Sequence, residues 1–235
     1  MAFEPDIVLE KITAATGRLL DTAATFTDDD VRRPSLLPGW SRGHVLTHVA
    51  RNADGGTRLL TWARTGIETP EYASLEARAQ EIEAGHRRSA GDLLADVRSS
   101  AGRFAVAYRA MPAEAWTRTL RWTSGKERAA SRAADSRLTE VLIHHVDLRA
   151  DYRPEDWPPD FVAEMLATVV SAFAGRADPP ALRLIAAETG TEYLIGDPDA
   201  ARTVEGAPTP LLAWLLGRSD GAELGAGLPR PPFLF

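Results

Sequence analysis

Residues 137–148 read "RLTEVLIHHVDL", and this stretch decides how most of the chain is interpreted. Its apolar residues recur at helical spacing, which predicts a helix with one face in a hydrophobic core. It also carries Glu140, His144, His145 and Asp147, which are costly to bury unless they are paired. Glu140 and His144 project from one face of the helix, one turn apart, and Asp147 continues the same stripe. A core-facing helix with these groups indicates a functional site.

A second helix is predicted over residues 41–63, "SRGHVLTHVARNADGGTRLLTWA", with Ser41 as its N-cap after a turn. His44 and His48 lie one turn apart on it. Packing this helix against residues 137–148 would bring two imidazoles and a carboxylate to one point in the core. That ligand set suits a divalent metal, especially zinc in a catalytic site with an open coordination position.

Each histidine also has a simpler interpretation. His44 lies near a helix start, where an exposed side chain is expected. His145 points about 100° away from its neighbour His144 and is expected to be packed. Asp147 is either a ligand or an acceptor that orients a ligand histidine. His86 precedes two arginines and is expected on a solvated face.

The first two-thirds of the chain read as helices. Residues 111–135 are mixed and predict a connection from one end of a bundle to the other, and the helix 74–110 is expected to bend at Gly85 or Gly91. Four helices with one long connection predict a four-helix bundle. The predicted helices cover residues 6–25, 41–63, 74–110 and 135–150.

The last third of the chain has a different pattern, with short predicted strands as well as helices. "DYRPEDWPPD" (151–160) reads as a linker, and Gly190 separates two short strands in a predicted hairpin. A helix capped by Thr209, with Pro210 at its first position, is expected near the end. The chain is therefore predicted to be α+β, with a helical domain over 1–152 and a small α+β domain over 153–235. Within the second domain we expect a helix over 160–174, strands over 181–188, 191–197 and 201–206, and a helix over 209–218.

Composition limits the possible functions. The 235 residues are 44% hydrophobic and 26% charged, which is typical of a soluble globular protein. No apolar run approaches the roughly 18 residues of a membrane helix, and the acidic N-terminus does not resemble a signal peptide. A cytoplasmic protein without a membrane partner is expected. The net charge of −6 disfavours nucleic-acid binding.

The chain has no cysteine, so any thiol used in its chemistry must come from a cofactor. Of its 27 basic residues, all except Lys11 and Lys126 are arginines. An anionic ligand would therefore meet a guanidinium group, which suits carboxylates.

The motifs "LPGWSRGHVLTHVARNADG" and "RLTEVLIHHVDL", with a small α+β domain after them, resemble the mycothiol-dependent maleylpyruvate isomerase family. The resemblance covers essentially the whole chain and implies a DinB-like metal-binding four-helix bundle. It places the metal ligands at His48, Glu140 and His144, and so chooses His48 over His44. It places a catalytic, substrate-binding arginine at Arg218, in "LLGRSDG".

The resemblance also suggests Arg78 as a second substrate-binding arginine. The implied cofactors are a divalent metal, zinc by expectation, and mycothiol. The implied reaction, a step of gentisate degradation, is the conversion of 3-maleylpyruvate to 3-fumarylpyruvate by addition and elimination of a metal-activated thiolate. Arg218 would then clamp the dicarboxylate from an interface between the two domains. The expected oligomeric state is a monomer.

Two other functions remain open. A mycothiol S-transferase would use the same metal and thiol but would consume the thiol. A metal- or thiol-binding sensor would bind its ligand without turnover. The sequence does not identify the metal, the substrate or the host's thiol.

Overall fold

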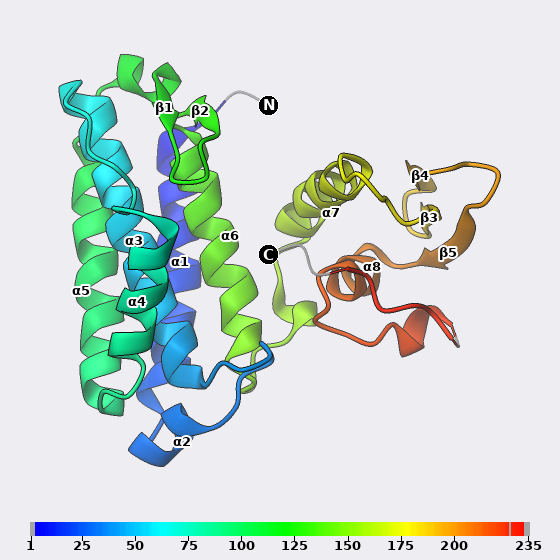
Figure 1. The fold of residues 1–235 in the computed structure, drawn as a ribbon, viewed down its shortest axis with the longest axis horizontal. Helices are drawn as coiled ribbons and strands as arrows, with labels where there is room; N and C mark the ends of the chain where they lie inside the picture. The colour runs from blue at the N-terminus through cyan, green and yellow to red at the C-terminus, as the bar shows by residue number, and fades with distance from the viewer. Residues whose placement is uncertain (1–2, 226, 233–235) are drawn as a thin grey trace. The chain divides into compact units, whose positions relative to one another are not determined.

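The computed structural model describes residues 3–225 and 227–232 of the chain. They form two compact units, Met1–Asp151 and Tyr152–Phe235. The first is a helical bundle and the second combines two helices with a small sheet, so the α+β class predicted from the sequence is confirmed (Figure 1). No helix among the described residues has the length and apolar character needed to cross a membrane.

Four long helices build the first unit: α1 (Pro5–Ala24), α3 (Arg42–Thr65), α5 (Ala90–Arg109) and α6 (Arg132–Asp147). Each packs against two of the others, in the cyclic order α1, α5, α3, α6 (Figure 1). Their apolar faces meet in a core that also takes in aromatic residues of the connection before α6. Burying such faces is what keeps amphipathic helices together in water.

The start of α3 is fixed by local chemistry. Ser41 is its N-cap, as predicted, and its Oγ accepts the backbone N–H of His44. The guanidinium of Arg42 donates to the carbonyls of Leu148 and Arg149 at 2.6 Å each, just beyond the end of α6. The first turn of α3 is thereby tied to the last turn of α6, which sets which residues of the two helices face each other.

The prediction of a single helix over residues 74–110 is wrong. The structure has two helices there, α4 (Leu75–Gly85) and α5, separated by a turn. The cause is Ser89, whose Oγ accepts the N–H of Asp92 and so caps a new helix, while the Arg88 side chain donates to the carbonyl of Gly85. A turn between two separate helices therefore replaces the expected bend within one helix.

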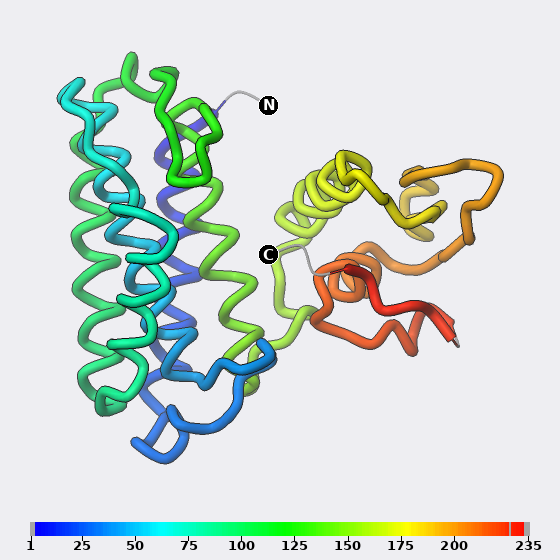
Figure 2. Tube along the Cα trace, in the orientation of Figure 1, coloured from blue at the N-terminus to red at the C-terminus, as the bar shows by residue number. Residues whose placement is uncertain are grey.

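Two further segments of the first unit have structure that the sequence did not indicate. A short helix, α2 (Asp28–Arg32), precedes α3 and is closed by a capping box at Thr27. The connection before α6 contains a 3₁₀ turn, η1 (Ala113–Thr117), and a hairpin of β1 (Thr119–Arg121) and β2 (Glu127–Ala129). Figure 2 follows the chain through this connection.

The second unit begins with a 3₁₀ turn, η2 (Pro154–Asp156), and α7 (Pro159–Ala174). Its sheet has the order β4-β3-β5. The predicted hairpin is present, with Gly190 in the left-handed region at φ 65°, and the third strand pairs parallel to the first. The strands are β3 (Leu182–Ala186), β4 (Thr191–Ile195) and β5 (Arg202–Gly206), followed by α8 (Pro208–Leu215) and a 3₁₀ turn, η3 (Ala222–Leu224).

The predicted cap of the last helix is wrong. Helix α8 begins at Pro208, one residue before Thr209, and its N-cap Ala207 makes no side-chain cap. Pro208 fits the first helical position because it has no N–H to satisfy and its φ is already helical. Buried residues of α8 face α7 and the sheet, and they include Trp214.

Candidate metal centre

Two helices of the bundle bring three side chains to one point. His48 comes from α3, and Glu140 and His144 come from α6. The Nε2 atom of His48 lies 2.7 Å from Oε2 of Glu140 and 3.0 Å from Nε2 of His144. The third side of the triangle, from His144 Nε2 to Glu140 Oε2, is 3.2 Å. The sequence prediction that these three residues meet in the bundle is therefore matched by their positions.

This arrangement fits a divalent metal. Ligand atoms about 2.1 Å from a tetrahedral zinc ion lie about 3.4 Å apart, so the three atoms need to separate by about 0.2 to 0.7 Å. The rings of His48 and His144 are nearly perpendicular, at 86°, which lets both Nε2 atoms point at one position between them. Two imidazoles and one carboxylate are a known donor set for zinc with an open fourth position.

Asp147 orients the ring of His144. Its Oδ2 is 2.7 Å from Nδ1 of His144, and its side chain is fully buried. A carboxylate at this distance keeps a proton on Nδ1, so Nε2 is the nitrogen that would bind a metal. Burial disfavours the doubly protonated ring, but the hydrogen bonds to Asp147 and Glu140 outweigh it and raise the pKa of His144 to about 9. A metal must therefore displace a proton from Nε2.

His48 has a different partner on its outer nitrogen. The guanidinium of Arg78, on α4, donates to Nδ1 of His48 at 3.0 Å. Burial lowers the pKa of His48 to about 4, and the charges of His144 and Arg78 act in the same direction. Trp40 packs its ring edge-on against His48. In this arrangement His48 is neutral and its Nε2–H points at Glu140.

Glu140 is the anionic member of the cluster. Burial alone would raise its pKa, but electrostatic attraction to the His48 ring and the hydrogen bonds from His144 and His48 hold the pKa well below its usual value. One turn earlier on α6, Arg137 is buried and donates to the Val49 carbonyl and the Asn52 amide oxygen. The cluster therefore offers a metal one negative charge, and one nitrogen of the nearby Arg137 guanidinium is held by the oxygens of Val49 and Asn52.

A cavity of about 430 Å³ lies in the same unit, between the segment before α4 and the β1–β2 hairpin. Tyr72 lines it, and the guanidinium of Arg78 lies 5.7 Å from the centre of the Tyr72 ring. Glu71 also lines it and accepts the N–H of Thr123, while burial raises the pKa of its carboxyl. Arg78 thus stands between the three-residue cluster and a wall of this cavity.

The remaining predicted residues lie elsewhere. His44 is not part of the cluster, and the expectation that it is exposed is wrong, because its ring is stacked on His86 and hydrogen-bonded to Ser41. The solvated position expected for His86 is wrong for the same reason, since its side chain is only 13% exposed. His145 is packed, as predicted, with Nε2 2.7 Å from Oγ1 of Thr22.

Arg218 belongs to the second unit, in the turn after α8, where its guanidinium donates to the carbonyl of Leu216. Its catalytic role stays a prediction. Arg78, which the family resemblance suggested, contacts the cluster through His48, and its substrate-binding role also stays a prediction. The pairing of Arg78 with the outer nitrogen of His48 has no sequence signal, because the two residues are 30 positions apart.

Comparisons with known proteins cover both units. A model described as the mycothiol maleylpyruvate isomerase N-terminal domain matches residues 12–149, and one described as the MDMPI C-terminal domain matches residues 156–231. No curated protein matches the chain.

Two crystal structures of the mycothiol-dependent maleylpyruvate isomerase superpose with a TM-score of 0.92, one of them a histidine-to-alanine mutant. They are 27% and 28% identical to this chain, and each alignment covers 98% of this chain and 97% of the other. The chain belongs to the mycothiol maleylpyruvate isomerase family.

Proposed function

We propose that the protein is a metal- and mycothiol-dependent isomerase that converts 3-maleylpyruvate to 3-fumarylpyruvate. The observation that carries the proposal is the convergence of two imidazoles and a carboxylate, with a buried aspartate behind one imidazole. Family membership supports the choice of reaction, and the similar solved structures are described as that isomerase.

His48, Glu140 and His144 would hold the metal, which we propose to be zinc. A bound zinc ion supplies a positive charge that keeps a thiol ionised at neutral pH. Mycothiol supplies the nucleophile whose reversible addition makes the substrate's double bond a single bond that can rotate. The absence of cysteine from the chain agrees with an external thiol.

In this proposal Arg78 changes its hydrogen-bond partner when the metal binds. A metal-ligating His48 gives its Nε2 lone pair to the metal and keeps its proton on Nδ1. Nδ1 then has no lone pair to accept the N–H of Arg78, so the guanidinium must turn to another acceptor. A carboxylate of the substrate is the partner that suits its planar pair of donors. Arg78 would thus bind substrate only in the metal-loaded protein.

Arg218 is proposed as the second arginine, which would bind the other carboxylate or the oxygen on which enolate charge develops. Fixed donors aimed at developing charge give large rate effects in acyl and enolate chemistry. This role requires Arg218 to reach the substrate during turnover.

The test uses zinc-loaded protein, maleylpyruvate and mycothiol at a concentration far below that of the substrate. Fumarylpyruvate formation with many turnovers per thiol is the expected result, and removal of the metal by a chelator should abolish it until zinc is added back. Consumption of one thiol per product would instead establish a mycothiol S-transferase. Metal and thiol binding without any product would leave a sensor as the function.

A further inference from the structure

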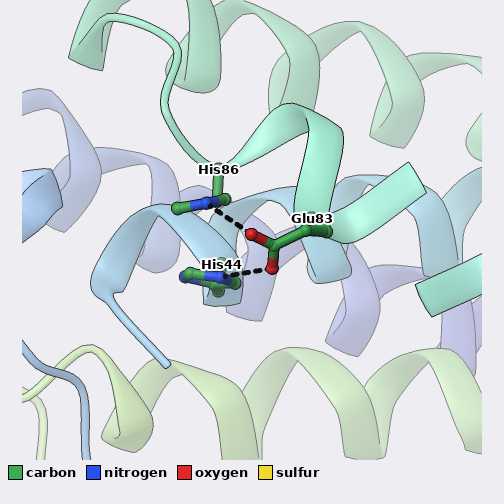
Figure 3. Close-up of side chains that lie close together, drawn as sticks. All are labelled: His44, Glu83 and His86. Atoms are coloured by element: carbon green, nitrogen blue, oxygen red, sulfur yellow. Dashed lines mark hydrogen bonds and ion pairs between the residues drawn. The ribbon is translucent and has the colours of Figure 1, made fainter. Parts of the chain in front are cut away.

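A second group of two histidines and a glutamate lies at the other end of the contact between α3 and α4. Figure 3 shows the carboxylate of Glu83 reaching both rings. One oxygen lies 3.3 Å from Nε2 of His44, and the other lies 3.2 Å from Nε2 of His86. The two rings are stacked with their centres 3.6 Å apart. Three potential metal ligands therefore converge outside the proposed catalytic centre.

Two glycines allow this close approach. A Cβ atom on Gly43, next to His44, would overlap the carbonyl oxygen of His86. A Cβ atom on Gly85, next to His86, would lie 2.6 Å from Cγ2 of Thr47, closer than real Cβ contacts come. Because both positions lack a side chain, the start of α3 and the end of α4 meet at backbone distance. The histidines that follow these glycines are brought together as a result.

The hydrogen bonds of the two rings show what an ion would displace. Nδ1 of His44 accepts the backbone N–H of Ser41 at 3.1 Å, so Nε2 carries the proton and points it at Glu83. Nε2 of His86 accepts the Nε–H of Arg87 at 3.3 Å, so it carries a lone pair and cannot also donate to Glu83. An ion bound by both rings and by Glu83 would take the place of the Nε2 proton of His44 and of the guanidinium of Arg87.

We propose that His44, Glu83 and His86 form a second divalent metal site, for an ion that takes imidazole and carboxylate ligands, such as Zn²⁺, Ni²⁺ or Cu²⁺. The site is accessible from solvent, because the side chain of Glu83 is 68% exposed. It binds more weakly than the proposed catalytic centre for two reasons. The ring planes are only 21° apart, so one ring must turn before both nitrogens point at one ion, and the positive Arg87 lies beside the ligands.

Binding of an ion at this second site would hold α4 against α3. Of the 11 residues of this helix, Ile82 alone is buried, so few apolar contacts hold it against the bundle. The same helix carries Arg78, which contacts His48. An ion held by His44 of α3 and by Glu83 and His86 at the end of α4 would join the two helices and limit the movement of Arg78. The second site would therefore regulate the order of the helix next to the catalytic centre.

The first experiment counts Zn²⁺ ions bound to metal-free full-length protein by equilibrium dialysis. Glu83→Gln and His86→Gln should each bind one ion fewer than Glu81→Gln, a matched control at an exposed position of α4. The difference of one should persist in a His48→Ala background, so the result does not depend on the proposed function. Equal counts in Glu83→Gln and Glu81→Gln would overturn the site, whether the shared count is zero, one or two.

The second experiment measures amide hydrogen exchange across α4 in the His48→Ala background. At a free Zn²⁺ concentration ten times the dissociation constant, exchange through opening of α4 should slow by about tenfold. The slowing should be absent when Glu83→Gln is added and retained when Glu81→Gln is added. Zn²⁺-dependent protection that survives Glu83→Gln, or no protection in the presence of a bound ion, would refute the fastening of α4.

Discussion

The bundle contains two clusters with the same composition, two histidines and a glutamate, and one histidine of each lies on the first two turns of α3. His48 meets Glu140 and His144 with rings nearly perpendicular and a glutamate that is 27% exposed. His44, one turn earlier, meets its partners with rings nearly parallel and a glutamate that is 68% exposed. Trp40 packs against both histidines of α3.

The difference between the clusters lies in what surrounds the ligands. The outer nitrogen of His144 faces the carboxyl group of Asp147, a hydrogen-bond acceptor with no exposed surface, whereas the outer nitrogen of His44 faces the backbone N–H of Ser41, a donor. Such outer partners orient the ring and decide which nitrogen keeps its proton when a metal binds. The same three residue types therefore give a preorganised centre in one place and an adaptable one in the other.

The sharpest test of this comparison is His48→Ala. We expect kcat/KM for maleylpyruvate to fall by about a thousandfold or more, because an ion with one ligand missing is neither held nor oriented. Zn²⁺ at the second cluster should be unaffected. Turnover assays and metal counts on the same samples measure both effects, with Glu81→Gln as the control. Activity above a tenth of the wild-type value would mean that the catalytic centre lies elsewhere.

The role assigned to Asp147 is tested by Asp147→Asn, which keeps the shape of the side chain. The amide can present N–H to Nδ1 of His144, which favours the tautomer with its proton on Nε2. We expect the Zn²⁺ affinity of the centre to fall by about 10- to 100-fold, the usual effect of losing such a partner. Competition with a chromophoric chelator measures the affinity, and Asp151→Asn, at an exposed position, is the control. An unchanged affinity would remove the proposed reason for the difference between the clusters.

Spacing along single helices was enough to predict Glu140, His144 and a histidine of the second helix as candidate ligands, and the family resemblance chose His48 over His44. Glu140 and His144 share a face because they are one turn apart, and the capping residue Ser41 marks where the helix of His48 begins. The hydrogen bonds of Arg42 to the end of α6 then fix the register between the two helices. That contact is specific in the structure but has no signature in the sequence.

The second cluster could not be predicted in this way. His86 and His44 are brought together by two glycines on different helices, and a glycine in a helix reads in the sequence only as a weak point. The break between α4 and α5 was missed for a related reason, because the helical pattern continues through it and Ser89 is one polar residue among many. Tertiary contact decided both cases.

The proposed coupling of Arg78 to metal binding is tested by Arg78→Met, which keeps most of the length of the side chain but removes its charge. We expect KM for the dicarboxylate to rise by about tenfold, consistent with the loss of a charged hydrogen bond of about 1.5 kcal/mol. The affinity for Zn²⁺ should stay the same or increase, because Nδ1 of His48 no longer accepts the N–H of Arg78. Arg98→Met, on the exposed face of α5, is the control. A loss of metal together with the rise in KM would indicate that Arg78 supports the centre instead of binding substrate.

The smallest expected effect comes from the glycine that lets α4 approach α3. In Gly85→Ala, the added methyl group would crowd Cγ2 of Thr47, and relief of this overlap should cost about 1–3 kcal/mol of unfolding free energy. Gly91→Ala is a matched control in the first turn of α5, where the added Cβ would lie 4.0 Å from Oγ of Ser89. There the methyl group should stabilise the protein by about 0.4–1 kcal/mol, since alanine restricts the unfolded chain. Denaturant titrations give both values.

If α4 is displaced, Gly85→Ala should also bind one Zn²⁺ fewer than Gly91→Ala, because His86 and Glu83 move away from His44 while the ligands on α3 and α6 stay in place. Equal stability and equal metal counts in the two variants would show that close packing at Gly85 does not hold the second cluster together.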